Sequence, residues 1–260
     1  MTTLDRNYPD LPMSTMQASK NLFIAPFNQA IGDQMDVITE GVDFSGLGLM
    51  QNRANTALVI LAMATILQAV EFLPDNETAE MMGKRMDWKY ALHLPIHFPG
   101  LEPEVLHDFR YELMRNEEGL QIFQSILDRL TQLGLLGCRK QQNTRALDLL
   151  NSICALNQIT NLTDAMSRLL EALSAEQPDW LRENFKPHWF CDYKSEVKSI
   201  AVPYQREQQL AMEKKITADI SHLLDALNKT NDPAIFEFPE IREIRNLIDE
   251  RSAAQSEMAH

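Results

Sequence analysis

The sequence predicts an all-α protein, and three observations lead to this prediction. Glycine is rare, with 9 residues in 260, whereas sandwiches and barrels need frequent tight turns. Residues that favour helices (Leu, Ala, Met, Glu and Gln) dominate the composition. Apolar residues recur at spacings of three and four along several segments, as on the buried face of a helix. An apolar content of 45% can fill a core, and the length suits one large domain or two small ones.

The N-terminal part begins with a polar leader and a short helical region. Residues 1–20 contain two prolines and read as a flexible leader. Residues 22–38 can form a helix that is interrupted near Pro26. Residues 41–52 hold three glycines and predict a connector.

The most apolar segment is residues 57–67, with the sequence ALVILAMATIL. It spans 11 residues, and a membrane-spanning helix needs about 20, so we expect a buried core helix, with Asn55 or Thr56 as its N-cap. We expect no membrane partner. The chain opens without a basic and apolar leader, so a cytoplasmic location is expected.

A helix-turn-helix-like segment is predicted next. Residues 77–82 read as a short helix that Gly83 can end in a left-handed conformation. Asp87 can cap a second short helix over residues 88–94. Two helices joined by a glycine turn are compatible with a helix-turn-helix.

The remaining elements are a proline-rich loop at residues 95–103 and a series of longer helices. Helices are predicted for residues 104–115, 118–135, 145–173, 206–228 and 238–251, with an aromatic connector between residues 180 and 190. Residues 137–143 (GCRKQQN) are a basic, polar break and the best candidate boundary. We therefore expect a leader at residues 1–20, an N-terminal helical bundle at residues 21–137, and a long helical hairpin within residues 138–260.

The net charge of −13 opposes DNA binding, because an acidic protein repels the phosphate backbone at long range. The acidity is uneven, however. Residues 84–145 carry 9 basic and 8 acidic side chains, a net charge of +1, whereas residues 1–83 and 146–260 each carry −7. The middle third of the chain is therefore the most compatible with an anionic partner.

Several short stretches in this part and beyond it appear in the same order as in a known family. They are residues 67–73 (LQAVEFL), 87–92 (DWKYAL), 99–100, 105–110, 134–136, 155–157, 178–182 (PDWLR), 189–190 and 223–227. Because of these stretches, the chain resembles bacterial insertion-sequence DDE transposases with an InsH-type N-terminal domain, over roughly residues 55–250. The resemblance implies a DNA-binding N-terminal module, followed by a helical insertion that in an intact relative would lie beside or within the nuclease-like domain.

The chain departs from this family where the chemistry would occur. The first catalytic Asp of the family lies in a Thr-Asp-Ser-Thr-His motif, and that position falls at Arg145 here. A guanidinium repels a divalent metal ion. Asp148 follows three residues later, but the flanking Ser, Thr and His are absent. The other two acidic positions of the family fall beyond residue 260. We therefore expect no catalytic residues, no cofactor, and no cutting or joining of DNA by this chain alone.

The candidate DNA-contacting residues are basic and aromatic side chains within or beside the matching stretches. They are Lys84, Arg85, Trp88, Lys89, Arg110, Arg139, Lys140 and Arg145. Basic groups can contact phosphates, and flat side chains can lie against the nucleic acid. The competing interpretation is that the aromatic residues belong to the core, that Arg110 pairs with neighbouring carboxylates, and that the other basic groups are solvated.

Other patterns carry little chemistry. His93, His97 and His107 span a proline-rich loop without an acidic partner at a fixed offset, so we expect no metal site there. Cys191 beside His188 is expected to be structural rather than a nucleophile. Cys138, Cys154 and Cys191 form neither a disulfide framework nor a metal pair.

Two function classes remain after the sequence is considered alone. The first is a transposase-derived protein that binds double-stranded DNA, for recognition of element ends or regulation of transposition. The second is an acidic, all-helical protein-interaction or oligomerisation module. The partners expected for either class are a second copy of the chain or an intact transposase. Apolar faces such as Leu147, Leu150 and Ile153, which a nuclease core would otherwise cover, predict a homo-oligomer.

Overall fold

The computed structural model describes residues 26–50, 53–136, 145–193, 202, 206–230 and 238–258. Every regular element within these residues is helical, so the prediction of an all-α fold is confirmed. The chain divides into two compact units, Met1–Cys154 and Ala155–His260, and the division falls inside the long helix α9 (Ala146–Glu176). No helix in the described part of the chain combines the length and apolarity needed to cross a membrane.

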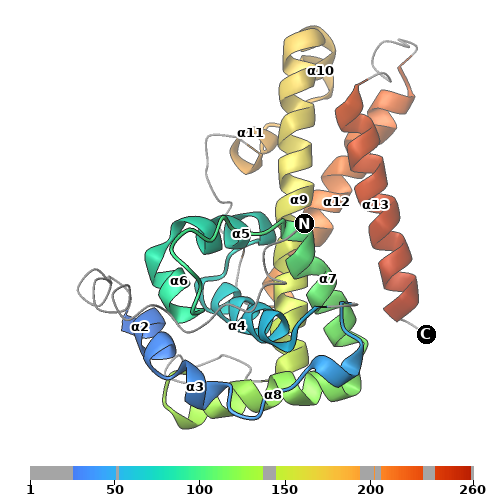
Figure 1. Cartoon of the computed structure of the whole chain (residues 1–260). Helices are drawn as coiled ribbons and strands as arrows, with labels where there is room; N and C mark the ends of the chain where they lie inside the picture. Colours follow the sequence, from blue (N-terminus) through green and yellow to red (C-terminus); the bar gives the residue numbers. More distant parts are fainter. Residues whose placement is uncertain are drawn as a thin grey trace. The chain divides into compact units, whose positions relative to one another are not determined.

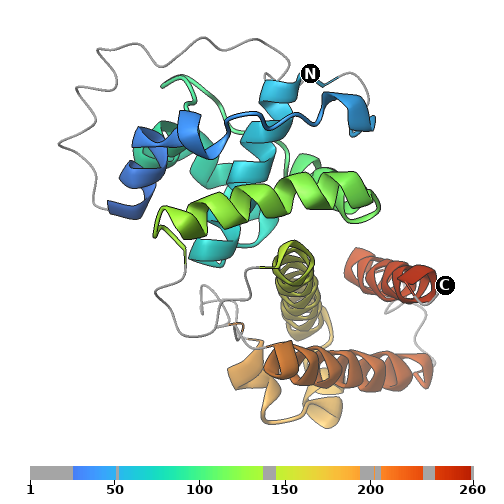
Figure 2. The ribbon, with the colours of Figure 1, turned by 90° about the horizontal axis from the view of Figure 1, so that it is seen from below.

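The N-terminal unit is built around helix α4 (Asn55–Glu71), which contains the most apolar segment of the chain. Eleven residues of α4 between Ala57 and Gln68 are buried, and only Val59 in this range is not. The expected core helix is therefore confirmed. Shorter helices surround it (Figures 1 and 2): α2 (Pro26–Asp33), α3 (Met35–Ile38), α5 (Asp75–Lys84), α6 (Met86–Ala91), α7 (Pro103–Met114) and α8 (Glu117–Gln132).

The start of α4 differs from the prediction. Its N-cap is Ala54, and no side chain caps it. The Asn55 side chain instead accepts a hydrogen bond from the N–H of Phe44 at 2.8 Å and donates to the carbonyl of Val42 at 3.0 Å. Asn55 therefore fastens the preceding connector to the helix, because its amide can both donate and accept.

The end of α5 also differs from the prediction. Gly83 does not end the helix, which continues to Lys84, and only Arg85 separates α5 from α6. A Cβ atom at Gly83 would lie 2.6 Å from the carbonyl oxygen of Pro99. The glycine is thus explained by the close approach of the proline-rich loop. The residue before α6 is Arg85, so Asp87 lies in the first turn of α6 and is not its N-cap.

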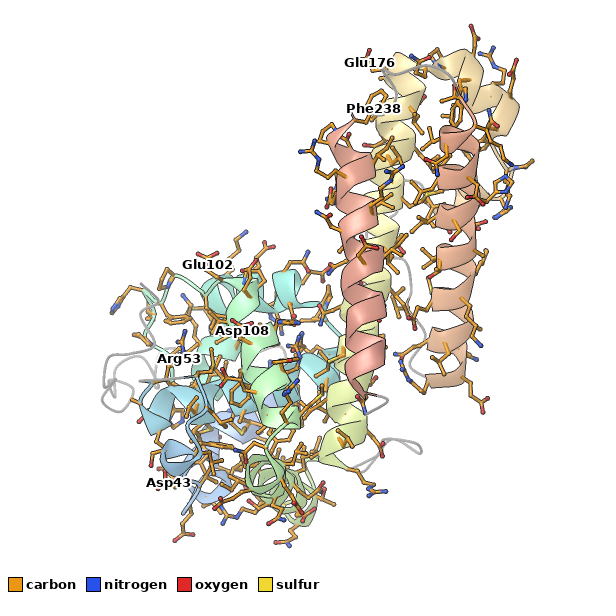
Figure 3. All side chains as sticks on the ribbon, turned by 90° about the vertical axis from the view of Figure 1, so that its right-hand side faces the viewer. Asp43, Arg53, Glu102, Asp108, Glu176 and Phe238 are labelled. Atoms are coloured by element: carbon orange, nitrogen blue, oxygen red, sulfur yellow. The ribbon has the colours of Figure 1, made fainter. Side chains whose placement is uncertain are left out.

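The C-terminal unit contains the C-terminal part of α9 with α10 (Pro178–Asn184), α11 (Trp189–Asp192), α12 (Arg206–Asn228) and α13 (Pro239–Met258). The C-terminal part of α9, α12 and α13 run roughly alongside one another (Figure 3). The buried residues of α12, including Ile216, Ile220, Leu223 and Leu227, recur at spacings of three and four, which gives the helix one apolar face. An ion pair between Arg168 and Glu243 joins α9 to α13 at the surface.

The prediction of exposed apolar residues at the start of α9 is only partly right. Leu147 is 47% exposed, but Leu150 and Ile153 are buried. Leu150 belongs to the core of the N-terminal unit, together with Ala146. The apolar face of the first turns of α9 is therefore largely covered within this chain.

Candidate nucleic-acid interface

Arg85, at the junction of α5 and α6, is held between two carboxylates. Its guanidinium donates to Asp87 from Nη2 to Oδ2 at 2.5 Å and from Nε to Oδ1 at 3.0 Å, and it also pairs with Glu71 of α4. The guanidinium lies 5.9 Å from the centre of the Trp88 ring. The hydrogen bond to Asp87 contributes most to raising the pKa of Arg85. Arg85 is half-buried, and its positive charge is paired with carboxylates of the protein itself.

Asp87 is the acceptor at the centre of this network. In addition to Arg85, it accepts a hydrogen bond from Nδ2 of Asn28 at 2.9 Å. Burial pushes the pKa of Asp87 upward, but the hydrogen bonds and the charge of Arg85 outweigh it and hold the pKa below its usual value. The carboxylate therefore stays ionised and ties α2 to the junction of α5 and α6.

Trp88 and Lys89 point into the protein. Trp88 is fully buried, and its Nε1 donates to Oε1 of Glu71 at 2.9 Å. Lys89 is 6% exposed, and its ammonium donates to the carbonyls of Ile96 at 2.5 Å and Phe98 at 2.9 Å. Burial lowers the pKa of Lys89. Lys89 thereby anchors the proline-rich loop to α6.

Arg110 is likewise an interior residue, with an exposed fraction of 1%. Its two terminal nitrogens donate to the two carboxylate oxygens of Asp75 at 2.7 and 2.5 Å. Gln68 completes the cluster, because its Oε1 accepts from Arg110 at 3.2 Å and its Nε2 donates to Asp75 at 2.7 Å. This bidentate pair joins α7 to the N-terminus of α5.

The other predicted contact residues lie at the surface or outside the described residues. The Lys84 side chain is 72% exposed and pairs with Glu80 one turn earlier at 2.5 Å. Arg145 is exposed and immediately precedes α9. Arg139 and Lys140 fall in residues 137–144, which lie outside the described part of the chain.

The structure therefore does not bring the eight predicted residues into one basic surface. The predicted DNA contact of Trp88, Lys89 and Arg110 does not fit this structure. Their side chains are buried and bonded to partners within the N-terminal unit. A phosphate could reach none of them without displacing these partners. Of the described candidates, Lys84 and Arg145 remain fully accessible, and Arg85 is accessible only in part.

Arg145, the residue expected at the position of a catalytic Asp, lies at the start of α9. Arg145 accepts a hydrogen bond on its carbonyl from the N–H of Leu149 at 3.1 Å, so it begins the first turn of α9. Asp148 lies in that first turn and is half-buried.

Sequence reasoning missed a cluster of potential metal ligands in the C-terminal unit. His188, Asp192 and Asp219 place one ligand atom each within 4.8 Å of one another. Nε2 of His188 lies 3.2 Å from Oδ2 of Asp219, which is 31 residues away in the sequence. No local spacing could have indicated this cluster, because α12 contributes its third member. Of the histidines considered from the sequence, His93 contacts the carbonyl of Gly32 through Nε2 at 2.9 Å.

Comparison with models of protein families, with curated proteins and with solved structures finds no match for this chain.

Proposed function

We propose that this chain is a transposase-derived protein that binds double-stranded DNA and does not itself cut or join it. The observation that carries the proposal is that separate stretches of the family resemblance meet in space. Glu71, from residues 67–73, bonds to Trp88, from residues 87–92. Gln68 of the first stretch bonds to Arg110 of a third. Stretches that the resemblance relates only by their order thus meet in two polar clusters along α4, one at Glu71 and one at Gln68, which supports retention of the family's N-terminal module.

The proposal that this chain does not cut DNA rests on Arg145. Its position is where the resemblance puts the first metal-binding carboxylate, and a positive side chain there opposes metal binding. The chain would then retain recognition without the chemistry. A protein of this kind can occupy element ends and compete with an intact transposase.

The proposed DNA contacts are four of the predicted basic residues of the N-terminal unit. These are Lys84 and Arg145, which are exposed, together with Arg139 and Lys140 of the basic break. All four belong to residues 1–154, the unit that contains the resembling module. Each would contact phosphate and position the module without specifying a base sequence.

The experiment is fluorescence anisotropy of labelled duplexes, of random sequence and of candidate element ends, at about 50 and 200 mM salt. We expect binding that weakens as salt rises and that is lost in a variant with Lys84→Ala, Arg139→Ala, Lys140→Ala and Arg145→Ala. A matched control changes four basic residues of the C-terminal unit: Arg182→Ala, Lys214→Ala, Lys229→Ala and Arg242→Ala, all exposed. Equal loss in both variants would indicate a net-charge effect, and no binding at low salt would refute the proposal.

A second candidate function is an acidic, helical interaction module. It is favoured by the burial of Trp88, Lys89 and Arg110, because the residues best suited to nucleic acid hold the fold instead. If DNA binding is absent, light scattering at micromolar concentration tests this alternative. A dimer or larger assembly would support an oligomerisation module, and a monomer would leave a different protein as the partner.

A further inference from the structure

The cluster of His188, Asp192 and Asp219 has the composition of a metal site. It supplies one imidazole nitrogen and two carboxylate oxygens, a donor set used by zinc and related first-row divalent ions. Asp192 belongs to α11, His188 immediately precedes α11, and Asp219 belongs to α12. An ion bound here would join the aromatic connector to α12 within the C-terminal unit.

The distances between the three ligand atoms are close to those around a bound zinc ion. Two ligands bound to one tetrahedral zinc lie about 3.4 Å apart, given bonds of about 2.1 Å. Nε2 of His188 and Oδ2 of Asp219 are already 3.2 Å apart. The carboxylate of Asp192 must approach by no more than about 1.4 Å, and its half-buried side chain leaves room for this movement.

The surroundings of Asp219 are those of an oriented ligand. Asp219 is 5% exposed, and the hydroxyl of Tyr193 donates to its Oδ2 at 2.9 Å. Trp189 is fully buried beside this cluster, and its Nε1 has no hydrogen-bond partner among the described residues. A buried donor such as the Tyr193 hydroxyl, which fixes the carboxylate, is the usual outer support of a metal ligand.

Two lysines currently neutralise the carboxylates. Lys215 pairs with Asp192 at 2.7 Å, and Lys186 approaches Asp219 at 3.4 Å. The Lys215 side chain is 52% exposed, so it can move into solvent with little loss, because an exposed ion pair contributes weakly. Lys186 is held partly by the Trp189 ring, at 5.5 Å from the ring centre. The lysines therefore compete with a divalent ion but do not close the site.

We propose that His188, Asp192 and Asp219 bind a first-row divalent cation of the zinc class, with water completing the coordination. The ion lies between His188 and Asp219, any proton on Nε2 of His188 is released to solvent, and Lys215 is displaced from Asp192. The site is independent of the proposed DNA contacts, since none of its residues lies in the N-terminal unit.

The test is isothermal titration of the full, chelator-treated chain with zinc chloride, together with the visible absorption spectrum of its cobalt(II) complex. We expect one ion per chain. His188→Gln and Asp192→Asn, both at accessible positions, should each weaken zinc binding by about tenfold or more. Lys215→Gln should strengthen it by up to about fivefold, because it removes the competing ion pair.

The matched control is His107→Gln, which removes an exposed histidine that lies 3.3 Å from Asp108 and has no third ligand among the described residues. This change should leave zinc binding unaltered. The absence of zinc binding, or zinc binding that survives both His188→Gln and Asp192→Asn, overturns the proposal. Far-ultraviolet circular dichroism of each variant separates loss of the site from loss of the fold.

Discussion

At the scale of single residues, the polar groups that the sequence offers for DNA are largely used to connect helices. Arg85, Lys89 and Arg110 each bond to partners at least one element away. A buried ion pair adds little net stability, but removal of one partner leaves the other charge buried and unpaired, which strongly destabilises the fold. These residues therefore constrain how the N-terminal helices assemble.

Arg110→Met should destabilise the protein by about 3–5 kcal/mol, because it leaves the Asp75 carboxylate buried without its cation. The double variant Arg110→Met with Asp75→Leu should recover most of this loss, since no buried charge remains. Urea denaturation measures both free energies of unfolding. Arg115→Ala, at an exposed position in the residue that follows α7, is the control and should change stability by about 0.5 kcal/mol or less. A single variant as stable as its control would contradict this account.

The lowered pKa of Asp87 predicts a dependence of stability on acid. A carboxyl with a folded pKa below its unfolded value of 3.8 stabilises the fold above that value, and the contribution is lost as pH falls through the folded pKa. Asp87→Asn should therefore lower the free energy of unfolding near neutral pH, and the difference from the natural chain should shrink below about pH 4. Urea denaturation over a pH series checks this, and a pH-independent difference would argue against it.

At the scale of elements, the junction of α5 and α6 is determined by a loop that packs against it. Gly83 and Gly100 face each other: a Cβ atom at Gly83 would lie 3.2 Å from the Cα atom of Gly100, which itself has a φ of +99°. The close approach lets the carbonyls of residues 96 and 98 reach the ammonium of Lys89. The two short helices are thus held in place by residues 95–103.

Gly83→Ala should destabilise the protein by about 1–3 kcal/mol, because the new methyl group would collide with the backbone of Pro99. The effect opposes the gain of about 1 kcal/mol that alanine brings to a helix interior. Gly46→Ala is the matched control, since no atom lies within 4 Å of its added Cβ. Thermal unfolding of both variants provides the measurement, and a stabilised Gly83→Ala would show that the loop can move away.

At the scale of the whole molecule, the net charge of −13 limits how DNA can bind. Among the described residues of the N-terminal unit, Arg85, Lys89 and Arg110 are bonded within the fold, and the acidic remainder of the chain repels phosphate. Under the proposed function, we therefore expect binding that involves few phosphates and depends modestly on salt.

The proposed contact set predicts that dependence. Four phosphate contacts give a slope of about −3.6 for the logarithm of the association constant against the logarithm of salt concentration. Arg145→Ala alone should reduce the magnitude of the slope by about 0.9. Anisotropy titrations at several salt concentrations measure both values. A slope of about −6 or steeper would mean that residues outside this set contact the backbone.

The sequence by itself determined the helical class, the central apolar helix and the approximate positions of the longer helices. α12 begins and ends at the predicted residues, 206 and 228. These properties could be predicted because they depend on local periodicity and on the rarity of glycine, which act over a few neighbouring residues.

Only the tertiary structure decided which basic and aromatic residues face inward. The hexapeptide at residues 87–92 carries no local mark that distinguishes a buried Lys89 from a solvated one, because its carbonyl partners lie 7 and 9 residues later in a loop. Arg110 meets Asp75 across 35 residues, and His188 meets Asp219 across 31. Such pairings depend on how helices pack, and a buried charge is tolerated only where packing brings its partner to it.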